Sequence, residues 1–159
     1  MVVQHVYIIG SKGLGNYGGY ETFVNKLTEY HQENPDVKYH IACKANGNGM
    51  MDESKLAGAK TISPHHFKYH NAICYKVEVP EKLGSAQAIF YDCRAFEWAL
   101  ANIKKHKVQH PIVYVLACRI GPFVGKYVRE LHRLGGKCYV NPDGDRQIIS
   151  RKNLVLKVA

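Results

Sequence analysis

A run of glycines between two regular patterns is the feature that most constrains the fold. Residues 2–9 are apolar and β-branched, which is typical of a buried strand. Five glycines lie within residues 10–19, a density that excludes a regular helix or strand there. Residues 20–30 then place apolar side chains at helical spacing, and residues 37–43 predict a second strand. This order of strand, glycine loop, helix and strand opens an α/β fold with a parallel sheet.

The rest of the chain continues the alternation of strands and helices. Residues 44–64 predict a long surface loop with one short helix around residues 53–57, and Ser85 is a candidate N-cap for the longest helix. The later elements are expected as a strand over 69–79, a helix over 86–105, a strand over 112–117, a helix over 123–134 and a strand over 137–140. We expect a Rossmann-like parallel sheet with helices on both faces, in one domain over residues 1–144.

Composition and charge narrow the class of protein. The 159 residues are 46% hydrophobic and 22% charged, a balance typical of a soluble globular domain. The formal net charge of +9 favours anionic partners, but the basic residues are dispersed and form no RNA-binding module, so we expect no nucleic-acid partner. No stretch is long and apolar enough to span a bilayer, and the amino terminus does not have the pattern of a signal peptide. These features predict a cytoplasmic protein.

Cysteine and histidine residues give no sign of a metal site. The five cysteines are odd in number and none is spaced as CxxC, which predicts buried free thiols in a reducing compartment. His65, His66 and His70 lie in a loop-like stretch with no nearby cysteine or pair of carboxylates. We therefore expect no metal and no resident cofactor.

The glycine loop formally contains GxGxxG over residues 13–18, a pattern that suits phosphate binding at a helix N-terminus. A dinucleotide site places its first glycine directly after the strand and an acidic residue at the end of the second strand, where this chain has Cys43 and Lys44. A Walker loop is excluded because no GK[ST] follows the glycines. A loop that only turns tightly between strand and helix remains an alternative.

Ligands of such a sheet bind beyond the carboxyl ends of its strands, so polar residues that follow strands are candidates. Glu21 opens the first helix, where it complements the helix dipole, accepts hydrogen bonds from sugar hydroxyls or orients Lys12. Arg119 follows an apolar strand, where it either binds phosphate or carboxylate or holds its own loop. Asp143 lies in a Pro-Asp-Gly sequence, which by itself predicts a turn.

Several segments, in order, resemble one family. They are IIGSKGLGNYGGYETFVNKLTEYH, KYHIACKA, YHNAICYKVEVP, LGSAQAIFYD, HPIVYVLACRIGPF and LGGKCYVNPDG. Together they are similar to the amino-terminal domain of bacterial rhamnosyltransferases and related family 4 glycosyltransferases, which build capsular and cell-wall polysaccharide. The resemblance covers residues 6–144.

The resemblance implies a GT-B architecture, in which two Rossmann-like domains face a cleft. The amino-terminal domain mainly holds the acceptor, a glycan or lipid-linked sugar, and the other domain mainly binds the nucleotide-sugar donor, here dTDP-rhamnose. Tyr17, Gly18, Gly19 and Glu21 would face this cleft. Transfer would proceed with retention and without an essential metal, and a lipid-linked acceptor would bring the enzyme to the cytoplasmic face of the membrane.

The chain departs from the family pattern in two places. The loop over residues 13–17 is one residue shorter, and residues 145–159 do not continue the family's His-Glu-Trp sequence. We therefore expect residues 145–159 to be an atypical tail, and the chain to hold half of a GT-B cleft, inactive alone and prone to associate through the uncovered interface. The alternatives are an independent phosphate- or nucleotide-binding module and, less favoured, a dinucleotide-dependent oxidoreductase.

Overall fold

The computed structural model describes residues 2–15 and 18–141 of the chain, which form one sheet flanked by helices. The strands are β1 (Gln4–Ile9), β2 (Val37–Lys44), β3 (Lys60–Ser63), β4 (His66–Tyr69), β5 (Ala72–Val77), β6 (Ile112–Val115) and β7 (Lys137–Val140). The helices are α1 (Gly19–Tyr30), α2 (Gln87–His106) and α3 (Val124–Arg133), with short 3-10 turns η1 (Glu53–Lys55), η2 (Glu81–Ala86) and η3 (Cys118–Phe123). The Rossmann-like α/β class is confirmed.

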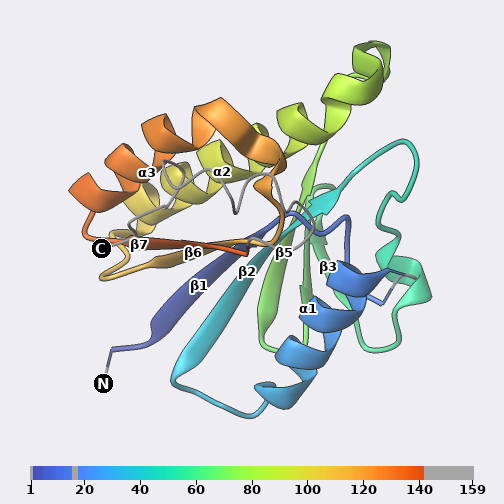
Figure 1. Ribbon diagram of the computed structural model, residues 1–159. Coiled ribbons are helices and arrows are strands. Elements are labelled where there is room, and N and C mark those ends of the chain that lie inside the picture. Colours follow the sequence, from blue (N-terminus) through green and yellow to red (C-terminus); the bar gives the residue numbers. More distant parts are fainter. Residues whose placement is uncertain (1, 16–17, 142–159) are drawn as a thin grey trace.

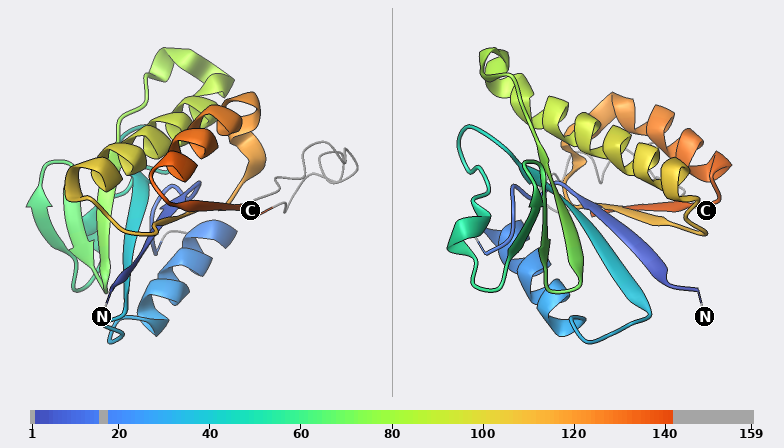
Figure 2. Two further views of the ribbon diagram at one scale, coloured as in Figure 1. Left: turned by 90° about the vertical axis from the view of Figure 1, so that its left-hand side faces the viewer. Right: turned by 180° about the vertical axis from the view of Figure 1, so that it is seen from behind.

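The seven strands are ordered β3-β4-β5-β2-β1-β6-β7. Strands β5, β2, β1, β6 and β7 are parallel, as predicted, whereas β3 and β4 run antiparallel at one edge. Helix α1 covers one face of the sheet, and α2 and α3 cover the other (Figures 1 and 2). The carboxyl ends of five parallel strands therefore lie at one edge of the fold, where the sequence places its candidate site.

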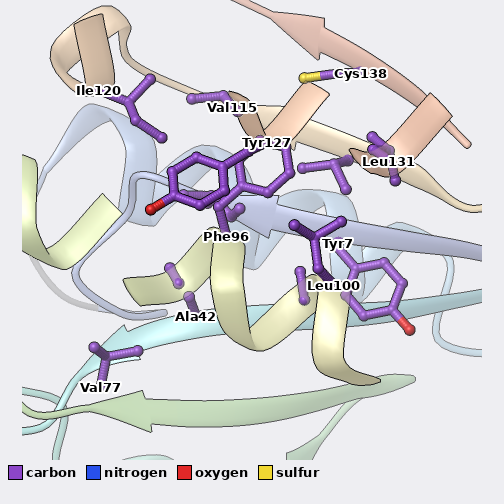
Figure 3. Packing of buried hydrophobic residues seen from close by; sticks show 14 of the residues in the cluster. Tyr7, Ala42, Val77, Phe96, Leu100, Val115, Ile120, Tyr127, Leu131 and Cys138 are labelled. Carbon is purple, nitrogen blue, oxygen red and sulfur yellow. The ribbon is translucent and has the colours of Figure 1, made fainter. Parts of the chain in front are cut away.

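Alternating side chains of the strands supply two cores. Tyr7 and Ile9 of β1 join the core under α2 and α3, whereas Ile8 joins the core under α1. In the first core, Phe96 of α2 stacks against Tyr127 of α3 with ring centroids 5.2 Å apart (Figure 3). An ion pair between Lys104 and Glu130 also joins these two helices.

The strand predicted over residues 69–79 is in part wrong. The chain turns at His70, whose φ is +51°, so residues 66–69 and 72–77 form two strands of a hairpin instead of one. Strand β3, within the predicted loop, extends this hairpin at the sheet edge. Its polar and exposed side chains, such as Lys60, give little apolar signal in the sequence, but they suit an edge strand.

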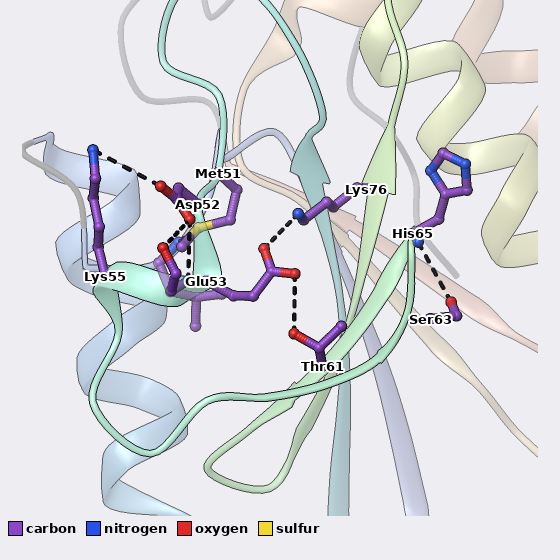
Figure 4. A network of polar contacts seen from close by, with 10 residues as sticks. Met51, Asp52, Glu53, Lys55, Thr61, Ser63, His65 and Lys76 are labelled. Atoms are coloured by element: carbon purple, nitrogen blue, oxygen red, sulfur yellow. Dashed lines mark hydrogen bonds and ion pairs between the residues drawn. The ribbon is translucent and has the colours of Figure 1, made fainter.

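The segment between β2 and β3 is tied to the sheet by polar contacts. Glu53 of η1 forms an ion pair with Lys76 of β5, and Thr61 donates a hydrogen bond to the same carboxylate at 3.4 Å (Figure 4). The short helix predicted around residues 53–57 is present as η1. Met51 is buried, and its sulfur accepts a hydrogen bond from the backbone N–H of Leu14.

The start of α2 differs from the prediction. The helix begins at Gln87 after a 3-10 turn, and its N-cap is Ala86 instead of Ser85. Gly84, with φ +53°, interrupts the helical geometry within η2, and no side chain caps the start of α2. Within the described residues, no helix has the length and hydropathy needed to cross a membrane.

Three of the described thiols follow the prediction of buried free cysteines, and Cys93 follows it only in being free. Cys43, Cys74 and Cys138 are buried and free, and Cys93 is free and partly exposed. Burial is the main cause that raises the pKa of the Cys138 thiol to about 12, so it remains protonated and unreactive.

Candidate functional site

Three basic residues gather beyond the carboxyl ends of β1, β2 and β6. Lys12 follows β1, Lys44 ends β2, and Arg119 lies in η3 after β6. The backbone N–H of Lys44 donates to the carbonyl of Lys12 at 2.7 Å, which fixes the two strand ends together. The pocket between them has a volume of about 230 Å³ and is called the cationic pocket here. It is lined by Lys12, Lys44, Gly84, Ser85, Gln87, Ala88, Tyr91 and Arg119.

Lys44 is the most buried cation of this pocket. Its residue is 8% exposed, and its Nζ donates to the carbonyl of Asn48 at 2.9 Å. Burial lowers the pKa of Lys44, and the neighbouring charges of Lys12 and Arg119 lower it further. An anion in the pocket would relieve this repulsion, so the site is suited to phosphate or carboxylate groups.

Arg119 is held by a buried carboxylate. Its Nε and Nη2 donate to Asp92 of α2 at 3.2 Å each, and Nη2 also donates to the carbonyl of Gly10 at 2.8 Å. Asp92 is fully buried. Burial raises the pKa of this carboxyl, and the Arg119 charge opposes the rise. Arg119 thus ties α2 to the glycine loop while it also lines the cationic pocket.

Tyr91, Asp92 and Lys44 were not among the predicted site residues. The hydroxyl of Tyr91 donates to the carbonyl of Ser11 at 2.6 Å, which joins α2 to the turn after β1. The sequence signal for Tyr91 and Asp92 is that they form a polar pair within an otherwise apolar helix face. The signal for Lys44 is its position at the end of the second strand, where a dinucleotide site needs an acid.

Glu21 shapes the glycine loop from the first turn of α1. Its Oε1 accepts a hydrogen bond from the backbone N–H of Lys12 at 2.9 Å. Its other carboxylate oxygen lies so close to Gly18 that a Cβ there would overlap it. Gly18 also has φ +154°, so both its conformation and the close approach of Glu21 favour glycine. The loop is therefore braced by the acid that the sequence places in YGG-x-E.

Gly19 belongs to a second hollow on the other side of the loop. This aromatic pocket has a volume of about 470 Å³ and is lined by Gly19, Tyr20, Phe23, Tyr114, Leu116 and Asn141. The predicted residues are thus divided: Lys12 and Arg119 line the cationic pocket, and Gly19 lines the aromatic pocket. Gly18 ends the glycine loop, Glu21 lies in the first turn of α1, and neither lines these two pockets. Tyr17 and Asp143 lie outside the described residues.

The described residues contain no group of three His, Cys, Asp or Glu side chains arranged to hold a metal ion. The neighbouring histidines of the hairpin have separate partners. His66 contacts the Ser63 hydroxyl at 3.0 Å, and His70 contacts the Thr28 hydroxyl at 2.9 Å.

The comparison with protein families covers nearly the whole chain. Residues 3–154 match a family described as a domain of unknown function, DUF1972. The chain belongs to this family. DUF1972 is associated with the amino-terminal regions of glycosyltransferases, which agrees with the coarser part of the resemblance drawn from the sequence. A comparison with curated proteins found no match.

The DUF1972 match bears on the position of the site. It includes the glycine loop, both strand ends with lysines and η3, so all of the cationic pocket belongs to the family domain. It also runs past Gly144, beyond which we expect an atypical tail. Residues 145–159 lie outside the described residues, and their assignment as a separate tail stays a prediction.

Proposed function

We propose that this chain is the acceptor-side, amino-terminal domain of a retaining glycosyltransferase that transfers rhamnose from dTDP-rhamnose during capsular or cell-wall polysaccharide synthesis. The observation that carries the proposal is the cationic pocket, because it lies at the carboxyl ends of the parallel strands, where ligands of such sheets bind. The association of DUF1972 with glycosyltransferases supports the reaction class. The choice of rhamnose rests on the sequence resemblance.

In this proposal the pocket binds the phosphate groups of a lipid-linked acceptor. Lys12 and Lys44 supply positive charge, and Arg119, oriented by Asp92, supplies a planar donor. These residues position the acceptor and catalyse nothing alone, since transfer needs donor and acceptor held together in a closed cleft. No metal or resident cofactor takes part, and the protein works in the cytoplasm with peripheral contact to the inner membrane face.

The surface that would face a second domain carries large exposed apolar side chains. Phe23, Phe123 and Tyr139 are 44%, 49% and 46% exposed, respectively. Large exposed side chains of this kind favour association. Light scattering coupled to size exclusion should show mass rising with protein concentration, and a monomer at all concentrations would contradict this part of the proposal.

Calorimetry with matched ligands tests the proposed function. A short-chain polyprenyl diphosphate sugar should bind the full chain, and dTDP-rhamnose should bind much more weakly. Lys12→Gln should weaken acceptor binding about tenfold, since one charge-assisted contact is lost. Lys60→Gln, on the exposed edge strand β3, should leave it unchanged.

Two outcomes would contradict the proposal. Micromolar binding of dTDP-rhamnose or free nucleotides, with no acceptor binding, would favour the independent nucleotide-binding module. Robust transfer of rhamnose to the acceptor by the chain alone would contradict its inactivity, although it would support the reaction class.

A further inference from the structure

A large cavity lies at the opposite end of the sheet from the cationic pocket. Its volume is about 560 Å³, within the usual range for small-molecule sites. It opens between the C-terminal end of α2 and the first halves of β1 and β2, with β4 and β5 forming the far wall. Nothing in the proposed glycosyl transfer uses this cavity.

The lining of the cavity carries positive charge without a compensating acid. Six residues that can bear a positive charge line it: His5, Lys38, His40, His66, Lys105 and His106. None of its lining residues is an aspartate or a glutamate. The ion pairs of the described residues include neither Lys38 nor Lys105. Such a cluster repels itself, and an anion would stabilise it.

The imidazoles of the cavity are affected by burial and by neighbouring positive charges. Burial lowers the pKa of His5, and the charges of Lys38 and His106 add to the effect. Burial likewise lowers the pKa of His66, with His65 and Lys105 contributing. Groups on β1, β2, β4 and α2 therefore act on one another across the cavity.

His40 and His5 form a contact between ring nitrogens in the wall of the cavity. Its Nε2 lies 2.8 Å from Nδ1 of His5, and its buried Nδ1 has no hydrogen-bond partner. His40 is 6% exposed and its pKa is lowered, so it remains neutral, and its Nε2 accepts when Nδ1 of His5 carries the proton. An anion bound in the cavity would favour the imidazolium form of His5, whose Nε2–H can then donate to that anion.

The remaining wall is apolar and aromatic. Ile73, Tyr75 and Trp98 line it, and the rings of Tyr75 and Trp98 stack with centroids 4.7 Å apart. Such a surface packs against an organic group. We propose that this cavity, the histidine cavity, binds a phosphomonoester, with the phosphate at Lys38, Lys105 and His5 and the ester group against Tyr75 and Trp98. This proposal does not depend on the glycosyltransferase assignment.

Titrations of the full chain followed by amide and imidazole NMR test the proposal. The probes are inorganic phosphate, glucose 1-phosphate and phenyl phosphate at about pH 6, where histidine protonation is accessible. Both esters should bind more tightly than inorganic phosphate and shift the signals of His5, Lys38 and Lys105. The tighter of the two esters identifies a sugar or an aryl group as the preferred ester. The His5 imidazole should titrate at higher pH with an ester bound than without it, because the anion stabilises the imidazolium.

Charge variants supply the control. The double variant Lys38→Gln/Lys105→Gln should weaken ester binding at least about tenfold, since two charge-assisted contacts are lost. Lys107→Gln, on the same exposed helix end but outside the cavity lining, should leave binding unchanged. The proposal would be overturned if the double variant and Lys107→Gln bound the esters with equal affinity. Shifts confined to the cationic pocket, or no binding of either ester, would also overturn it. Both variants replace exposed side chains, so we expect both to fold, and the NMR spectrum of each shows whether it has folded.

Discussion

The two ends of the sheet are both basic, but they are built differently. At the carboxyl end, Arg119 is bonded to the buried Asp92, and the Nζ of Lys44 donates to a backbone carbonyl. At the amino end, Lys38 and Lys105 face histidines and no carboxylate lines the cavity. The first arrangement fixes its cations in place. The second leaves them to the solvent, so its charge responds to pH and to anions.

This difference predicts where the fold is most sensitive. Removing a partner at the carboxyl end leaves a cation without its buried counter-charge, which affects folding. Changing a group at the amino end alters a repulsive cluster, which affects the pH dependence of stability.

The largest effect is expected at Asp92. Asp92→Asn should lower the free energy of unfolding by about 3 kcal/mol, since it leaves Arg119 without its buried carboxylate. The value lies at the low end of the range for buried pairs because the Arg119 side chain is 33% exposed. Urea unfolding measures it.

The control is Glu29→Gln, which removes an exposed pair with Lys26 on α1. It should change stability by less than about 0.5 kcal/mol. Equal effects of the two variants would show that the Asp92 contact does not anchor the carboxyl end.

The second effect is the acid sensitivity set by His40. Burial and the charges of His5, Lys38 and His106 lower its pKa to about 3 in the folded protein. The unfolded chain, with a histidine pKa of about 6.5, binds the proton first as pH falls. Stability is therefore lost below about pH 6.5, by about 2 kcal/mol between pH 7 and pH 5.

His40→Gln should remove this part of the pH slope, whatever its effect on stability at neutral pH. His132→Gln, which changes an exposed residue on α3, should retain the slope. Chemical unfolding at several pH values decides between them, and an unchanged slope in His40→Gln would contradict the amino-end account.

A smaller effect separates two adjacent glycines. Gly18→Ala should cost about 1–3 kcal/mol, because a Cβ would meet Glu21 and the φ is unfavourable for alanine. Gly19→Ala should be neutral or stabilise by up to about 1 kcal/mol, since a Cβ there meets nothing and residue 19 begins α1. Thermal unfolding of both variants checks the contrast, and similar losses would mean that Glu21 does not fix the loop.

The smallest effect concerns the start of α2. Ser85→Ala should change the free energy of unfolding by less than about 0.5 kcal/mol, whereas a lost N-cap typically costs about 1 kcal/mol. The reason is that Ser85 lies in the 3-10 turn and caps nothing. A loss of about 1 kcal/mol would indicate that Ser85 is the N-cap of α2, as the sequence predicts.

The sequence predicts β1, β2, β6 and β7 well because each is a short segment rich in apolar residues next to a clear helical pattern. It predicts the edge hairpin poorly, because the alternation of apolar and polar residues over 69–79 shows no break at His70, where the chain turns. For the site, strand ends and the glycine loop lead to Lys12, Glu21 and Arg119. The partner of Arg119 lies 27 residues earlier on α2, and no local pattern can reveal such a pairing.

If the carboxyl end of the sheet binds an anionic acceptor, as proposed, the residues of the cationic pocket should respond to that ligand. The most direct measurement is amide NMR of the full chain titrated with the polyprenyl diphosphate sugar and, separately, with dTDP-rhamnose. We expect shifts at Lys12, Lys44 and Arg119 with the acceptor and much smaller shifts with the donor. Shifts at these residues with the donor alone, or none there with either ligand, would rule out the proposed acceptor site.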